Sequence, residues 1–413
     1  MKQSNDIWIL IIGSRNMITP SGEWKLISER AKSIKAVMGI SSKMLNITKD
    51  RMPLIQDVLP KMEGLEIINY SFINPWGFIS AFIRLFRKAN KVIKEDRIGI
   101  IILSGAISYL FWPFIKRKGL KVGVDIHGPL EEWLEYPPSS LRMRPLAKYS
   151  YKIFKYLEKY IIKRCEFCIV VSEPLRKYII KEYDKKEVLI IPCGLCSILE
   201  DDEIIKFRNH WRNQLNIDNE TLFVYCGGLS KWQLVDKCCI IFKDLQRWFC
   251  PSKLLLITPN PLAAKDIAIS SGLKESEVIC EYIKPERIKE ILCAGDIGLL
   301  IREKSITNYM AFPNKFADYM NSGLIIITTS GLGVPSKIVR DSHIGIVISN
   351  KGLNVVKNDI RELLDIYYKR KSNLHAYYNM TRTVVSFSVD MKKHVNQFIK
   401  LVLPSEGKHS PHS

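Results

Sequence analysis

The sequence AGDIGLLIREKSITNYMAFPNKFADYMNSG, residues 294–323, decides the fold. Its residues 297–301 form an apolar run that is typical of a strand buried on both faces, and Arg302 follows at the carboxyl end. Pro313 and Asn314 then introduce a run with helical spacing, and we expect Asn314 to be the N-cap of that helix. Gly323 ends the helix before a second apolar run at 325–328. This strand–helix–strand order indicates parallel strands.

The same alternation continues in both directions along the chain. The apolar runs predict strands at 8–12, 43–46, 66–69, 98–103, 121–125, 167–171 and 188–192, and again at 221–226, 254–258, 278–281, 297–301, 325–328 and 344–347. Amphipathic stretches separate them. The pattern predicts an α/β protein with two doubly wound, Rossmann-like domains facing a cleft, and such sheets bind ligands at the carboxyl ends of their strands.

The predicted domain boundary follows the strand at 188–192, where Cys193, Gly194 and an acidic stretch at 200–203 interrupt the pattern. We expect an N-terminal domain at 1–196 and a C-terminal domain at 197–385. A helix at about 386–403 has no strand after it, and we expect it to pack back on the first domain. The polar tail 404–413 is expected to be disordered.

The charge of the chain predicts an anionic partner. The formal net charge is +20 over 413 residues, which suits nucleic acid, a membrane surface or a phosphorylated substrate. Residues 142–164 hold eight basic side chains and one acidic one, with aromatic residues between them. Such a helix fits the surface of an anionic membrane, and it equally fits a solvated face on a helix that packs into the core.

The compartment is expected to be the cytoplasm, with peripheral association at the inner face of the membrane as a further expectation. The first residues lack the pattern of a secretion signal. The apolar stretch 98–115 contains glycine and proline, so we expect a buried strand and a short helix there rather than a membrane span.

The ten cysteines include two C-x2-C pairs, Cys165 with Cys168 and Cys193 with Cys196. This resembles the spacing of a zinc ribbon, but 24 residues separate the pairs and the first pair runs into a predicted strand. We therefore expect buried free thiols and no metal site.

The residues after the 297–301 strand suit an anionic ligand. The guanidinium of Arg302 emerges at the end of the strand, and Lys315 adds a second cation. The N-terminus of the following helix offers backbone amides at Lys315, Phe316 and Ala317, a geometry that binds phosphate. One turn further, Asp318 can accept hydrogen bonds from ribose hydroxyls. These features predict a site for the diphosphate of a nucleotide.

Five segments together resemble glycosyltransferase family 4, which has the GT-B fold. They are VDIHG (124–128), IVVS (169–172), IPCG (191–194), YCGGLSKWQ (225–233) and the segment 302–323. The resemblance implies a retaining glycosyltransferase with a nucleotide-sugar donor as its substrate and no cofactor. It also implies a saccharide or lipid-linked acceptor and a part in surface polysaccharide biosynthesis.

The resemblance also implies roles for single residues. His127 corresponds to a histidine that contacts the transferred sugar, and its place in a turn after a strand favours a ligand contact over a turn-capping role. Arg302 and Lys315 would stabilise the charge of the departing nucleoside diphosphate. Gly22, at a helix entry, stands where the family has a loop that contacts acceptor and donor phosphate.

The chain departs from the family pattern at two cationic positions. The family often has an arginine and a lysine five residues apart after the first strand of the second domain. Gly228 and Gln233 occupy these places here. We expect Gly228 to contribute to donor binding, with Lys231 replacing the missing cation.

The family pattern also has two glutamates eight residues apart. The second corresponds to Asp318, which keeps a carboxylate for the ribose. The first corresponds to Met310, which cannot make a polar contact with the sugar. That role is either vacant or taken by Asn308 or Asn314, and Asn314 is expected among the donor-binding residues.

Other functions are compatible with parts of this pattern. A nucleotide-sugar epimerase of the same fold would need acid and base groups and more histidines, and two of the seven lie in the tail. A non-enzymatic basic protein could bind nucleic acid or glycan, although no helix-turn-helix, zinc finger or RNP motif occurs, so no nucleic-acid partner is expected. A transferase that binds glycan without turnover is a third alternative, prompted by Met310.

Overall fold

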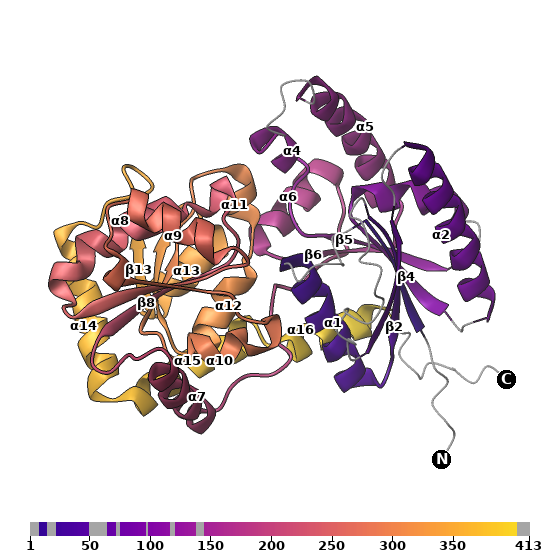
Figure 1. Ribbon diagram of the computed structural model, residues 1–413. Helices are drawn as coiled ribbons and strands as arrows, with labels where there is room; N and C mark the ends of the chain where they lie inside the picture. Colours follow the sequence, from indigo (N-terminus) through magenta and orange to yellow (C-terminus); the bar gives the residue numbers. More distant parts are fainter. Residues whose placement is uncertain are drawn as a thin grey trace, which may run out of the picture. The chain divides into compact units, whose positions relative to one another are not determined.

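The computed structural model describes residues 8–14, 22–48, 64–71, 75–95, 98–115, 120–137 and 144–402. The chain divides into two compact units: an N-terminal unit, Met1–Cys196 with Met391–Ser413, and a C-terminal unit, Ser197–Asp390 (Figure 1). The tail 404–413, predicted to be disordered, lies outside the described residues. Each unit is built on one parallel sheet, so the predicted α/β class is confirmed.

The N-terminal unit contains a seven-stranded sheet in the order β3-β2-β1-β4-β5-β6-β7. All its strand pairs are parallel. Its strands are β1 (Trp8–Gly13), β2 (Ser42–Thr48), β3 (Leu65–Ser71), β4 (Ile98–Ser104), β5 (Lys121–Ile126), β6 (Phe167–Val170) and β7 (Val188–Ile190). β4 and β5 are buried along nearly their whole length, as strands covered on both faces must be.

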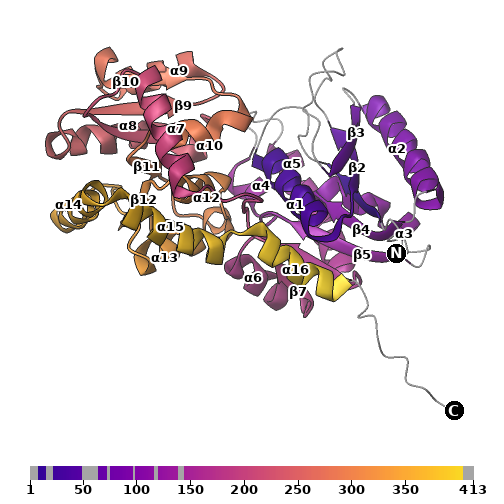
Figure 2. The ribbon, with the colours of Figure 1, turned by 90° about the horizontal axis from the view of Figure 1, so that it is seen from below.

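Helices cover both faces of this sheet. They are α1 (Gly22–Met38), α2 (Pro75–Glu95), η2 (Ala106–Phe111), α3 (Trp112–Ile115), α4 (Glu132–Glu135), α5 (Arg144–Ile162), α6 (Glu173–Tyr183) and α16 (Met391–Val402). The last helix, α16, packs beside α1 (Figure 2). α2 lies on the opposite side of the sheet (Figure 1).

The apolar stretch 98–115 forms a strand and two short helices. β4 is followed by a turn at Gly105, then by η2 and α3. The predicted strand and short helix are therefore both present. Among the described residues, no helix has both the length and the apolar character needed to cross a membrane.

The C-terminal unit contains a six-stranded parallel sheet in the order β10-β9-β8-β11-β12-β13. Its strands are β8 (Thr221–Cys226), β9 (Ser252–Ile257), β10 (Val278–Glu281), β11 (Ile297–Leu300), β12 (Ile325–Thr329) and β13 (Gly345–Ile348). β8, β11 and β12 are the central strands and are fully buried, so the loops at their carboxyl ends emerge side by side.

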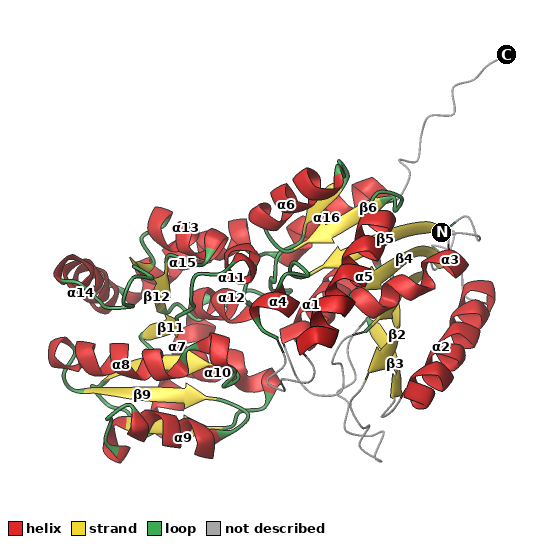
Figure 3. Cartoon of the chain, turned by 90° about the horizontal axis from the view of Figure 1, so that it is seen from above, coloured by secondary structure: helices red, strands yellow, loops and turns green. Residues whose placement is uncertain are grey.

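Helices flank this sheet as well, and Figure 3 shows strands enclosed by helices in both units. The α-helices are α7 (Asp201–Gln214), α8 (Val235–Leu245), α9 (Pro261–Ser270), α10 (Ile288–Leu292), α11 (Ile306–Met310), α12 (Asn314–Asn321), α13 (Gly333–Asp341), α14 (Lys357–Ser372) and α15 (Leu374–Ser388). The 3-10 turns are η5 (Lys231–Gln233), η6 (Gln246–Trp248), η7 (Glu275–Glu277) and η8 (Pro285–Arg287).

A buried carboxylate fixes the start of β11. Asp296 Oδ1 accepts hydrogen bonds from Arg208 at 2.6 Å and Arg370 at 2.8 Å, and its Oδ2 accepts one from the backbone amide of Leu222 at 2.9 Å. Burial alone would raise the pKa of Asp296, but the surrounding guanidiniums lower it. The carboxylate thus ties α7, α14 and β8 to β11, the strand that precedes Arg302.

Candidate functional site

Arg302 leaves the carboxyl end of β11 with its backbone held on both sides. Its amide donates to Thr329 Oγ1 at 3.1 Å, and its carbonyl accepts from Thr329 Oγ1 at 2.7 Å and from Asn350 Nδ2 at 2.8 Å. The buried guanidinium donates through Nη1 to the carbonyl of Trp232 at 3.3 Å. The strand end and the loop after β8 are therefore joined through one arginine.

Lys315, in the first turn of α12, reaches the same loop. Its Nζ donates to Gln233 Oε1 at 2.8 Å and lies 4.1 Å from the centre of the Tyr225 ring. Burial, together with the charge of Arg302, lowers the pKa of Lys315 to about 7. The structure thus brings together the two cations that the sequence predicted for this site.

The loop after β8 makes room for the lysine. Gly227 has a φ of +145°, and a Cβ there would lie 3.0 Å from Lys315 Nζ. The carbonyl of Gly228 accepts a hydrogen bond of 2.5 Å from the Tyr225 hydroxyl, while the space around the Gly228 Cα is open. A side chain is therefore strained at Gly227 and sterically allowed at Gly228.

The start of α12 differs from the prediction in its details. The expected N-cap role of Asn314 is wrong: Pro313 occupies that position and Asn314 is the first helical residue. The amide of Phe316 was expected to be available to a ligand, but it donates to the Pro313 carbonyl at 3.0 Å. The side chains of Phe316 and Ala317 are buried, so these two residues can offer a ligand nothing but backbone.

Two further residues that are predicted to bind the nucleotide-sugar donor differ in their burial. Asp318 is buried in the second turn of α12. Lys231 begins η5 with an exposed side chain. Asp318 shares α12 with Lys315, and Lys231 shares η5 with Gln233.

The positions considered for the missing acid lie on or beside α11. Met310 is the last residue of this helix and is partly buried. The buried Asn308 donates from Nδ2 to the Glu303 carbonyl at 3.0 Å, and its amide donates to Ser305 Oγ at 3.0 Å. This asparagine therefore stabilises the loop between β11 and α11.

His127 follows β5 in the N-terminal unit. Its Nε2 lies 2.8 Å from Asp125 Oδ2, and Asp125 is also paired with Arg30 of α1. Burial alone would raise the pKa of Asp125, but the charges of Arg30 and His127 lower it. Gly22 is the first residue of α1; the loop at 15–21, which precedes it, lies outside the described residues.

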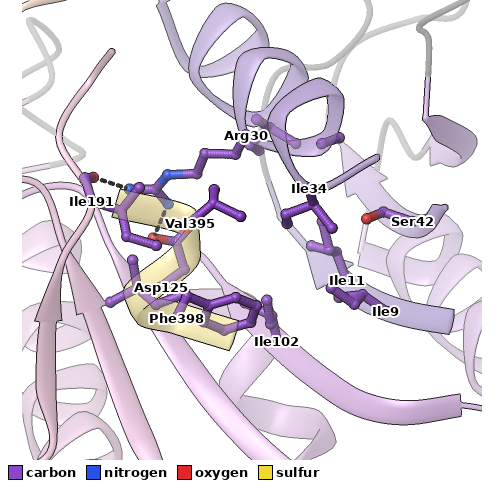
Figure 4. A pocket seen from close by; sticks show the side chains of 13 residues that line it. Ile9, Ile11, Arg30, Ile34, Ser42, Ile102, Asp125, Ile191, Val395 and Phe398 are labelled. Carbon is purple, nitrogen blue, oxygen red and sulfur yellow. Dashed lines mark hydrogen bonds and ion pairs between the residues drawn. The ribbon is translucent and has the colours of Figure 1, made fainter. Parts of the chain in front are cut away.

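A cavity of about 30 Å³ lies in the N-terminal unit between the sheet, α1 and α16. Figure 4 shows isoleucines, Val395 and Phe398 around it, with Arg30 and Asp125 at one side. A space of this size holds about one water molecule, whereas a sugar needs far more. The cavity is therefore not a substrate site.

All ten cysteines fall within the described residues and are free thiols. Cys165 and Cys168 are buried with their sulfur atoms 3.7 Å apart. In the part of the chain that the structure describes, no three side chains of His, Cys, Asp or Glu gather as metal ligands.

Sequence reasoning missed several residues that shape the site in the C-terminal unit. The motif 225–233 gives no sign that the ring of Tyr225 lies against Lys315. Thr329 is the last residue of β12 and Asn350 follows β13, and both bind the backbone of Arg302. Both residues lie at the carboxyl ends of strands, which would mark them as candidates. The amino-acid sequence does not reveal which strands are neighbours in the sheet, so it could not pair them with Arg302.

The comparisons with known proteins concern the fold and one stretch of the sequence. Residues 51–196 match the family model described as Glycosyltransferase Family 4. No curated protein sequence matches the chain. Similar solved structures include sucrose-phosphate synthase from Thermosynechococcus elongatus, with 15% identity, 96% of this chain and 98% of that chain covered, and a TM-score of 0.70.

Two further structures have the same fold. WaaG, a glycosyltransferase involved in lipopolysaccharide biosynthesis, is 14% identical with a TM-score of 0.63, covering 95% of this chain and 100% of its own. HepE from Anabaena in complex with UDP-glucose is 13% identical with a TM-score of 0.64, covering 95% and 98%. These likenesses show the GT-B fold, and residues 51–196 of the N-terminal unit are similar to glycosyltransferase family 4.

Proposed function

We propose that the C-terminal unit binds the diphosphate of a nucleotide-sugar at the carboxyl ends of β8 and β11. The carrying observation is that Lys315 and Arg302 donate hydrogen bonds to neighbouring residues of one loop, Gln233 and Trp232, beside Gly227 and the first turn of α12. Two desolvated cations beside a helix N-terminus suit a ligand with several negative charges. The nucleotide-sugar is a substrate, and no further cofactor enters the proposed reaction.

The chemistry that we propose is transfer of the sugar with retention of configuration at its anomeric carbon. Breaking the glycosyl–phosphate bond leaves negative charge on the nucleoside diphosphate, which Lys315 and Arg302 stabilise. His127 contacts the transferred sugar, and Asp318 accepts hydrogen bonds from the ribose. Lys231, Asn314 and the backbone of Gly228 complete the donor contacts.

The N-terminal unit, in this proposal, binds a saccharide or lipid-linked acceptor. Gly22 contacts the acceptor or the donor phosphate. The product belongs to surface polysaccharide biosynthesis, performed in the cytoplasm. HepE, one of the similar structures, is complexed with UDP-glucose, which makes uridine the first base to test.

Peripheral association with an anionic membrane is also part of the proposal. On α5, Tyr149, Ile153, Tyr156 and Tyr160 follow one another at helical spacing, and Tyr149 and Tyr156 are 68% and 72% exposed. Exposed lysines flank this stripe at 148, 152 and 159. An exposed aromatic stripe between lysines suits the interface of an anionic bilayer.

One lysine of this helix does not have the predicted role. Lys155 was expected on the exposed basic face, but its Nζ bonds to Glu131 at 2.9 Å and lies over the Tyr178 ring. It therefore holds α5 to the loop after His127 and should be left unchanged in tests of membrane binding.

Donor binding is tested by thermal shift with UDP, GDP, ADP and TDP. A ligand at 100 times its dissociation constant adds about 2.7 kcal/mol to the free energy of unfolding. We expect a shift with one of the four that is lost in Lys315→Ala and kept in Lys206→Ala, which removes an exposed lysine of α7. No shift with any nucleotide, or equal shifts in both variants, would contradict the donor site.

Membrane binding is tested by co-sedimentation with vesicles that contain phosphatidylglycerol or phosphatidylcholine alone. We expect binding to the anionic vesicles that weakens when Lys148, Lys152 and Lys159 are changed to glutamine. The matched control changes three exposed lysines of the C-terminal unit, at 206, 337 and 357, and so has the same net charge. Equal loss in both triple variants would show that net charge, not α5, drives the binding.

A further inference from the structure

Two buried charged side chains lie behind His127 in the N-terminal unit. Arg30 comes from α1, and Asp125 is 95 residues later in the chain, on β5. Arg30 Nη1 donates to Asp125 Oδ1 at 2.5 Å, and Nη2 donates to the Ile191 carbonyl at 2.6 Å (Figure 4). The other carboxylate oxygen, Oδ2, lies 2.8 Å from His127 Nε2. Each carboxylate oxygen of Asp125 therefore has its own hydrogen-bonding partner, Arg30 for Oδ1 and His127 for Oδ2.

The contribution of a buried ion pair to folding stability does not explain why Arg30 and Asp125 occupy this core. A buried ion pair loses its hydration, and apolar side chains of similar volume serve a core equally well or better. The surroundings of Arg30 and Asp125 are mainly isoleucine, valine and phenylalanine. A charged pair in such a core indicates a purpose beyond packing.

The chemistry of the carboxylate determines which nitrogen of His127 holds the proton. Arg30 favours the ionised form of Asp125, and an ionised carboxylate can accept hydrogen bonds but cannot donate them. Nε2 must therefore carry a hydrogen and donate it to Oδ2. In the neutral ring Nδ1 is then the acceptor atom.

We propose that Asp125 and Arg30 are positioning residues, which fix the tautomer and the orientation of His127 for sugar transfer. Arg30 holds Asp125 and, through Ile191, the end of β7. Asp125 in turn holds the imidazole with Nε2 as its donor atom and Nδ1 as its acceptor atom. This inference rests on the proposed function in one respect, the contact between His127 and the transferred sugar.

The tautomer is measured directly by NMR of the full-length protein labelled with 15N-histidine, at a pH where the ring is neutral. The His127 signals are those that disappear in His127→Gln. We expect a protonated Nε2 and an unprotonated Nδ1. A His127 ring that is protonated at Nδ1, or an equal mixture of the two forms, overturns the proposal without any variant of Asp125 or Arg30.

Two variants then test the positioning. In Asp125→Asn the amide can accept from Nε2 or donate to it, so we expect a mixture of tautomers. Arg30→Met removes the cation that orients the Asp125 carboxylate, so we expect the His127 ring to lose its single orientation and both tautomers to be detected. Asp184→Asn is the matched control, because Asp184 is exposed and has φ of +54°, a conformation that asparagine tolerates.

Activity is followed as release of UDP from UDP-glucose. Loss of a group that orients a functional side chain typically costs roughly 10- to 100-fold, and we expect kcat to fall by this much in Asp125→Asn with a smaller change in KM. Full activity in Asp125→Asn, beside an inactive His127→Gln, overturns the positioning role and leaves the proposed function intact. Full activity in His127→Gln refutes its contact with the sugar, while the NMR result still decides the tautomer.

Discussion

Lys315 has a pKa close to the physiological range, because it is buried beside the positive charge of Arg302. A diphosphate favours the charged form of this lysine. Above pH 7 the free protein must take up a proton in order to bind, so nucleotide affinity should fall up to about tenfold per pH unit. We expect this slope in calorimetric titrations between pH 7 and 9, using the nucleotide identified by thermal shift.

Lys315→Arg is the control for this pH dependence. Arginine keeps its charge throughout the range, so the affinity of this variant should change little with pH. Parallel pH profiles for the natural protein and Lys315→Arg would mean that another group titrates. The test therefore separates the charge of Lys315 from its place in the site.

The two adjacent glycines after β8 give a second prediction at the residue scale. In Gly227→Ala the new methyl group would lie 3.0 Å from Lys315 Nζ, at a backbone φ of +145°. We expect weaker nucleotide binding, by roughly tenfold or more, because both the loop and the lysine must shift. Gly228→Ala is the matched control, since its Cβ would meet open space. Equal affinities in the two variants would remove Gly227 from the site.

The pairing of these residues shows what the sequence could predict. Arg302 and Lys315 were identifiable because each follows a strand or begins a helix in a recognisable order. Gln233 was noted where the family has a lysine, but its actual partner, Lys315, is 82 residues away. Such a contact depends on the order of strands in the sheet, and the alternation of strands and helices does not specify that order.

At the scale of elements, α5 is held to η2 and α6 through a buried carboxyl group. Glu158 of α5 accepts hydrogen bonds from Tyr109 at 3.2 Å and from Tyr183. Burial raises its pKa to about 7. A carboxyl group with a folded pKa above its unfolded value stabilises the fold at low pH, and this contribution is lost as the pH rises through 7.

Glu158→Gln should remove this pH dependence. Between about pH 5 and 7 the free energy of unfolding of the natural protein should decline relative to the variant, by up to about 1.4 kcal/mol per pH unit. Urea denaturation at pH 5, 6, 7 and 8 measures the difference. Glu182→Gln, at an exposed position of α6, is the control and should follow the natural protein. A constant difference between Glu158→Gln and the natural protein would exclude the titration.

The elements themselves were largely predictable, whereas their ends were less so. Residues 297–301 and 325–328 are predominantly apolar, and both coincide with central strands to within a residue. The N-cap of α12 was assigned to Asn314 because asparagine favours that position. Pro313 takes the position instead, with an extended backbone and no capping side chain. The general preference of asparagine for the N-cap therefore gave the wrong residue, because the backbone conformation of Pro313 sets the start of this helix.

At the scale of the whole molecule, the last helix completes the core of the unit that contains the first strand. Phe398 of α16 is 1% exposed, and its ring centre lies 5.6 Å from that of Phe167 on β6. Phe398→Ala should cost about 3–5 kcal/mol of unfolding free energy in the N-terminal unit. The matched control is Phe387→Ala at the end of α15, where the side chain is 84% exposed. Equal losses in urea denaturation would mean that α16 does not support the core.

The packing of α16 on α1 has a consequence for the order in which the protein is made. A ribosome releases the C-terminal unit, Ser197–Asp390, as one continuous stretch, which can fold once it has emerged. The N-terminal unit begins earlier, but it must wait for Met391, whose amide bonds to the Leu195 carbonyl at 3.0 Å, and for the helix that follows. Throughout translation, the face of α1 that α16 will cover stays open to chaperones. The N-terminal unit, whose synthesis begins before that of the C-terminal unit, is therefore completed after it.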